Sequence, residues 1–176
     1  MAVIPAAMTL LEAAKRGDEG AFEVLLSPLL EPGYRLAGGM LQDHQAAQDA
    51  VQEAAFKAWR KMRQLREGSE MRPWFLGIVA NECRSVRRSR WSSVVKVVEP
   101  ATSDVVPADA VLTRIQVRNA LLQLDRKKRL ALVLHWYLDL PLDEIASITG
   151  SSIHAVEGQI QRGKHELRKQ MEAYRG

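Results

Sequence analysis

Apolar residues recur at steps of three and four positions along almost the whole chain, a spacing that gathers them on one face of an α-helix. In the first half this pattern predicts helices over residues 9–16, from 18 to beyond 30, over 43–65 and over 73–90. Asp18 and Asp43 are expected to cap the second and third of these helices, because an Asp side chain accepts hydrogen bonds from the free N–H groups there. Pro28 and Pro32 are expected to break or kink the second helix. The polar segment 66–72 is predicted to be a loop.

The second half repeats the helical pattern after an interruption. Helices are predicted over residues 110–124, 126–138, 142–148 and 152–174. Between the halves, residues 92–108 lose the helical period and contain Pro100 and Pro107, which indicates a linker. Fully extended, this linker would reach about 55 Å, and one turn of B-DNA spans about 34 Å. The predicted fold is therefore all-α, with two small helical domains, 1–91 and 109–176, joined by a flexible linker.

Composition and charge narrow the class of protein. The chain has 176 residues, of which 47% are hydrophobic, enough for packed cores. Its net charge of +4 is mild, but the basic residues are clustered. The three blocks are Arg84, Arg87, Arg88 and Arg90; Arg126, Lys127, Lys128 and Arg129; and Arg162, Lys164, Arg168 and Lys169. Each block is either a solvated helix face or a surface that holds phosphates.

Several other classes are disfavoured by the sequence. The single cysteine, Cys83, allows no internal disulfide, which suits the reducing cytoplasm, and a packed thiol is expected there. No apolar run approaches the roughly 18 residues that a membrane span requires, so no membrane insertion is expected. The four histidines form no spaced metal set, and neither a phosphate-binding glycine loop nor a nucleophile motif is found. We therefore expect neither an enzyme nor a bound metal or other cofactor.

Residues 141–163 fit a helix–turn–helix, in which a short helix and a tight turn present a second helix to the major groove of DNA. The first helix has apolar residues at Leu142, Ile145 and Ile148, and Gly150 suits the turn. Ser152 can cap the second helix. Its exposed positions near that end would be Ser152, His154, Ala155, Glu157, Gly158 and Gln161. A plain helical hairpin is the alternative, and the basic residues that follow favour DNA.

The C-terminal part resembles region four of bacterial sigma factors, which binds promoters. The resemblance covers residues 121–171. The matching residues are Arg129, Glu144-Ile145-Ala146, Gly150, Val156, Arg162, Lys164 and Leu167-Arg168.

The N-terminal part resembles region two of the same family, which binds the polymerase core and the minus-ten element. The matching residues are Ala47, Asp49, Val51, Gln52, Glu53, Phe56, Ala58 and Trp59, then Pro73, Trp74, Asn81, Arg87 and Arg88. Two regions in this order, without the extra regions of housekeeping factors, are typical of the extracytoplasmic-function (ECF) group.

The resemblance implies specific partners and sites. Core RNA polymerase would be bound by Asp49, Gln52, Glu53 and Phe56. Promoter DNA would be bound by Arg72, Asn81, Arg84, Arg87, Arg88, Arg90, Ser152, His154, Glu157, Gln161, Arg162 and Lys164. An anti-sigma factor is a further expected partner. The alternative is a helix–turn–helix regulator that does not bind polymerase, and such a regulator has no reason to carry the match at residues 49–59.

The second helix of the helix–turn–helix departs from the family pattern. The family usually has Thr, Lys, Ser and Arg at four positions that are here Ala155, Glu157, Gly158 and Gln159. Two positive charges are lost and one negative charge is gained. The sequence therefore predicts weak binding to the minus-thirty-five element.

Overall fold

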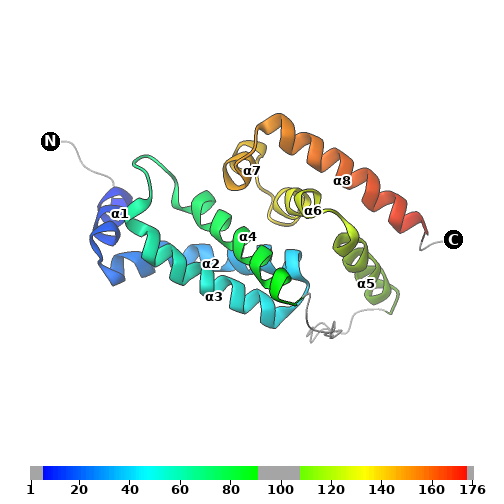
Figure 1. Cartoon of the computed structure of the whole chain (residues 1–176), viewed down its shortest axis with the longest axis horizontal. Coiled ribbons are helices and arrows are strands. Elements are labelled where there is room, and N and C mark those ends of the chain that lie inside the picture. The colour runs from blue at the N-terminus through cyan, green and yellow to red at the C-terminus, as the bar shows by residue number, and fades with distance from the viewer. Residues whose placement is uncertain (1–5, 91–107, 174–176) are drawn as a thin grey trace.

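The computed structural model describes the backbone of residues 6–90 and 108–173, and the side chains of residues 10–86 and 113–173. Every regular element in these described residues is helical (Figure 1). The predicted all-α class, with two helical parts, is thereby confirmed. The predicted linker at 92–108 lies outside the described residues except for Ala108, at which the next helix begins.

The first half packs three long helices around a common core. Helix α1 spans Ala6–Arg16, α2 spans Glu19–Leu41, α3 spans His44–Lys61, the short 3₁₀ turn η1 spans Met62–Gln64, and α4 spans Met71–Arg90. Helices α2, α3 and α4 contact one another in every pair. Both predicted caps are present, since Asp18 Oδ1 accepts from the Ala21 N–H and Asp43 Oδ1 from the Ala46 N–H, each at 2.8 Å.

Two details of the first half differ from the sequence prediction. Helix α2 is continuous through Pro28 and Pro32, so of the predicted break or kink the break is wrong. A proline removes one helical hydrogen bond, but α2 packs against α3 and α4, and Leu26 and Leu36, on either side of the two prolines, are buried. The predicted loop at 66–72 also ends early, because α4 already begins at Met71.

The second half contains the predicted helix–turn–helix. Helix α5 spans Ala108–Gln123, α6 spans Arg126–Leu132, and α6 runs into a π-helical turn, η2, at Val133–Tyr137. Helix α7 spans Leu142–Thr149 and α8 spans Ile153–Ala173. Between them Gly150 adopts a left-handed conformation with φ 63°, which glycine takes without steric cost. Ser152 caps α8, because its Oγ accepts from the Ala155 N–H at 3.1 Å.

The two halves lie in direct contact and share one hydrophobic core. Helix α4 packs against α7 (Figure 1), and α2 packs against η2. Two glycines permit this approach: a Cβ at Gly39 would lie 2.7 Å from a Val133 methyl group, and one at Gly77 would lie 3.3 Å from the Ile148 carbonyl oxygen. The boundaries predicted at residues 91 and 109 stay a prediction.

Across the described ranges, no helix combines the length and apolar character needed to cross a bilayer. The same residues contain no group of three or more His, Cys, Asp or Glu side chains arranged to hold a metal ion.

Candidate functional site

An exposed stripe runs along α3. It consists of Asp49, Gln52, Glu53 and Phe56, which we call the α3 stripe. Their spacing of three and four residues places them on one face, and all four are exposed. The opposite face of α3 is buried at Ala47, Ala50, Val51, Ala54 and Ala58. Phe56 is 56% exposed, a large fraction for an aromatic ring, and the Arg60 guanidinium lies over it at 5.7 Å from the ring centroid. The structure therefore brings together the residues that the sequence assigned to core binding.

A groove lies beside the α3 stripe, where α3 meets α4, and has a volume of about 530 Å³. Helix α3 contributes the four stripe residues and Ala50 to its lining, and α4 contributes Glu82 and Val86. Glu82 is buried and accepts a hydrogen bond from Lys57 Nζ at 2.8 Å. Lys57 Nζ also lies 3.4 Å from Glu53 Oε1. The hydrogen bond to Glu82 and the nearby carboxylates together raise the pKa of Lys57 despite its partial desolvation.

The candidate DNA-binding residues of α4 are only partly described. Asn81 and Arg84 are exposed, one turn apart. Arg87, Arg88 and Arg90 belong to the end of α4, and their side chains lie outside the described residues. Arg72 lies in the first turn of α4, where its Nε is 3.1 Å from Glu144 Oε1 of α7. The arrangement thus pairs one candidate DNA contact with the helix–turn–helix.

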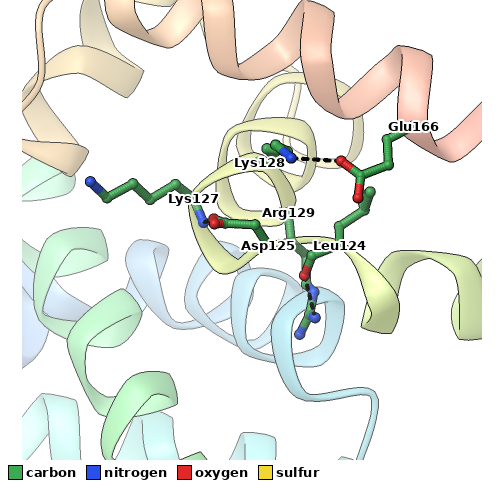
Figure 2. Close-up of polar contacts among 6 residues, drawn as sticks. All are labelled: Leu124, Asp125, Lys127, Lys128, Arg129 and Glu166. Carbon is green, nitrogen blue, oxygen red and sulfur yellow. Dashed lines mark hydrogen bonds and ion pairs between the residues drawn. The ribbon is translucent and has the colours of Figure 1, made fainter.

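Three of the four basic side chains at 126–129 bind groups on other helices. Arg129 is 1% exposed, and its guanidinium donates to carbonyl oxygens of Leu121, Leu122 and Leu124 and to that of Met40 in α2. Figure 2 shows the guanidinium directed toward the Leu124 carbonyl and Lys128 paired with Glu166 of α8, at 2.6 Å. Arg126 donates to the Ala80 carbonyl oxygen at 3.1 Å. Most of this block therefore fastens helices together.

Cys83 is buried beside this junction, as expected for a packed thiol. Burial raises its pKa to about 12, so the thiol stays protonated at neutral pH and is a poor nucleophile.

The first turns of α8 present a mixed polar surface. His154, Glu157 and Gln161 are exposed on one side of the helix, and Arg162 and Lys164 are exposed one turn farther on. The His154 ring lies 3.8 Å from Glu157, a weak pair at the surface. The Ser152 hydroxyl, also predicted to contact DNA, serves as the helix cap. Arg162 lies over Gly158, since a Cβ at that glycine would be 3.0 Å from its guanidinium.

Two charged residues are buried among those that the structure describes, and the sequence pattern did not predict their burial. Glu82 was not singled out, although a glutamate on the core side of an otherwise apolar helical pattern is a usable signal for a buried ion pair. Arg129 was assigned to the basic block, and only the three-dimensional position of the α5 and α2 carbonyl groups reveals its role.

Two sequence families match this chain. Sigma-70 region 2 matches residues 26–93, and Sigma-70, region 4 matches residues 114–167. Together the matches cover more than half of the chain. The first range contains the α3 stripe and its groove, and the second contains the helix–turn–helix.

Individual relatives agree over nearly the full length. The ECF RNA polymerase sigma factor SigW of Bacillus subtilis is 26% identical and covers 92% of this chain and 94% of its own. The RNA polymerase sigma-H factor of Pseudomonas aeruginosa is 27% identical and covers 93% and 92%.

Two solved structures share the fold. CnrH, solved with the cytosolic domain of CnrY, has a TM-score of 0.74 at 24% identity and covers 96% of this chain and 98% of its own. The sigma factor RpoE of Bartonella quintana, solved with the anti-sigma factor NepR, has a TM-score of 0.67 at 24% identity and covers 86% and 96%.

Proposed function

This chain belongs to the ECF group of RNA polymerase sigma factors, and from this membership we propose which of its surfaces bind which partner. The chain binds core RNA polymerase and directs promoter recognition, melting and initiation. We assign core binding to the α3 stripe, and promoter binding to α4 and α8. The chain acts as a binding factor and catalyses no reaction of its own. Because it binds the polymerase, it acts in the cytoplasm.

The observation that carries this proposal is the exposed α3 stripe. Phe56 is largely exposed beside two carboxylates and an amide on the same helix face, and aromatic side chains are enriched in protein interfaces. A helix–turn–helix regulator without a polymerase partner has no need of this surface. The α3 stripe and α8, the second helix of the helix–turn–helix, occur in one chain. A factor that connects polymerase with DNA requires both surfaces.

Promoter binding makes demands on the contact between the two halves. Arg72 of α4 pairs through its Nε with Glu144 of α7, so the contact between the halves occupies part of its guanidinium. A partner that keeps the halves together also keeps this ion pair, which leaves fewer of the five N–H donors of Arg72 for DNA. An anti-sigma factor is proposed as such a partner.

The direct test is run-off transcription with core polymerase on a library of genomic promoter fragments. We expect transcripts that depend on both this chain and the core, with start sites that share a common upstream sequence. Binding of the chain to DNA in the absence of any effect on core polymerase would favour the regulator instead.

Replacing Glu157 by lysine is expected to strengthen binding to duplex DNA of any sequence. Glu157 is exposed on α8 beside the DNA-facing positions, where its carboxylate meets a dense row of phosphates. The substitution adds one phosphate contact, which should steepen the dependence of log affinity on log salt by about one unit. Titrations at several salt concentrations on a selected site and on scrambled duplex measure this.

Two other results would contradict this expectation. If Glu157→Lys weakens binding to the selected site and removes preference at one base pair, Glu157 accepts a hydrogen bond from a cytosine amine. If neither affinity nor salt dependence changes on either DNA, α8 is not the helix that binds DNA.

Removing Arg84, Arg87 and Arg88 together is expected to weaken promoter binding by the holoenzyme and to reduce its salt dependence. Three lost phosphate contacts lower the slope of log affinity against log salt by up to about 2.7 units. Removing Lys15 and Arg16 from α1 serves as the control and should leave the slope unchanged. An unchanged slope in the triple variant would assign these arginines to a solvated helix face.

A further inference from the structure

The groove between α3 and α4 contains an unusual charge arrangement. Glu82 is the one acidic residue that is buried in the described part of the chain, with a side chain only 9% exposed. A buried carboxylate is costly unless a cation compensates it, and Lys57 supplies that cation at 2.8 Å. The same ammonium also serves Glu53, at 3.4 Å. One cation is therefore shared between two carboxylates, and Asp49 adds a third carboxylate to the groove.

The walls of the groove suit a long basic side chain. Phe56 and Val86 provide apolar surface on the two helices, and more than half of Phe56 is exposed. Arginine and lysine bury their aliphatic stems against such surface while the charged end seeks an anion. An arginine has an additional advantage, because its planar guanidinium can bind carboxylates on two sides.

We propose that this groove receives a basic side chain of the polymerase core, which takes the place of Lys57 at Glu82. The inference rests on the proposed function and extends it, because it adds a residue of α4 to a surface otherwise assigned to α3. The occupant follows from charge complementarity and from continuity, since all four residues of the α3 stripe also line the groove. In the free protein Lys57 then acts as an internal substitute, which pairs with Glu82 until the basic side chain of the core arrives.

Two substitutions with opposite expected effects test this. Glu82→Gln removes the charge but keeps the size, and should weaken binding of core polymerase about tenfold or more, with a weaker salt dependence. Lys57→Met removes the internal substitute. It should tighten core binding, because the free protein loses an ion pair that the complex does not use. The same substitution should lower the melting temperature of the free chain.

The control is Glu23→Gln on the exposed surface of α2, which removes the same charge away from the groove and should leave core affinity unchanged. The proposal is overturned if Glu82→Gln binds core as tightly as the original chain. It is also overturned if Lys57→Met weakens binding as much as Glu82→Gln, because Glu82 would then act only by holding Lys57 and Glu53 in place. Melting curves establish that each variant is folded at the temperature of the assay.

The outcome can be separated from that of the proposed function. If Asp49→Arg combined with Glu53→Arg leaves core binding intact, the α3 stripe does not bind core and both proposals fail. If those substitutions abolish binding while Glu82→Gln has no effect, core binding by α3 stands and only the groove is excluded.

Discussion

Replacing Asp49 and Glu53 together by arginine is expected to abolish the complex with core RNA polymerase. Both side chains are exposed on the α3 stripe, so a partner that meets them meets two negative charges. The double substitution reverses both, and like charges across an interface cost several kcal/mol. We expect affinity to fall about 1,000-fold or more, which corresponds to about 4 kcal/mol. Co-elution with core and anisotropy titration of a labelled chain measure the loss.

The fold should survive this change. Asp49 accepts a hydrogen bond from Gln45 at 3.1 Å, and Glu53 pairs with Lys57, both at the surface of the molecule. Surface interactions of this kind contribute about 1 kcal/mol or less. A matched control carries arginine at Glu19 and Glu23, an exposed pair on α2 with the same spacing of four residues. Core binding of the control should be unchanged, and wild-type affinity in the Asp49/Glu53 variant would remove the α3 stripe from the interface.

The helices and the helix–turn–helix were predictable because their signals are local. Asp18, Asp43 and Ser152 each cap the helix that follows them, as their side chains and positions indicated. Gly150 adopts the left-handed conformation that the turn requires. The spacing of Asp49 and Glu53 on one helix face also needs no knowledge of the rest of the fold.

Features that depend on distant segments were not predictable in this way. Pro28 and Pro32 would end an isolated helix, yet α2 continues because α3 and α4 hold it on both sides. The role of Gly39 depends on Val133, almost a hundred residues farther along the chain. The small size of Gly39 allows close packing between the two halves, and nothing near it in the sequence identifies Val133 as its neighbour.

The same limit applies to charged residues. A run of four basic residues at 126–129 predicts a positive surface when only the sequence is considered. Arg129 instead points inward, because the carbonyl groups at the end of α5 and the end of α2 converge at its position. Glu82 is buried for a similar reason, since Lys57 approaches it from a different helix. Whether a charge faces solvent depends on partners that the local pattern does not contain.

Replacing Arg129 by methionine is expected to destabilise the whole chain. The guanidinium donates to three carbonyl oxygens around the end of α5 and to the Met40 carbonyl oxygen of α2 (Figure 2 shows the bond to Leu124). Methionine fills similar space but donates no hydrogen bond, so these buried acceptors lose their partner. The cost should be about 3 kcal/mol or more. For a chain of this size the melting temperature should fall by about 6–12 °C.

A neighbouring residue of α6 separates this effect from the loss of a positive charge. Lys127 is exposed, and its side chain extends away from the junction in Figure 2. Lys127→Met therefore removes the same charge but no buried hydrogen bond, and its melting temperature should stay close to that of the original chain. Arg129→Lys keeps the charge but cannot span four acceptors, so it should fall between the two. If Arg129→Met has the same melting temperature as Lys127→Met, the carbonyl groups find other donors, and Arg129 does not hold α5, α6 and α2 together.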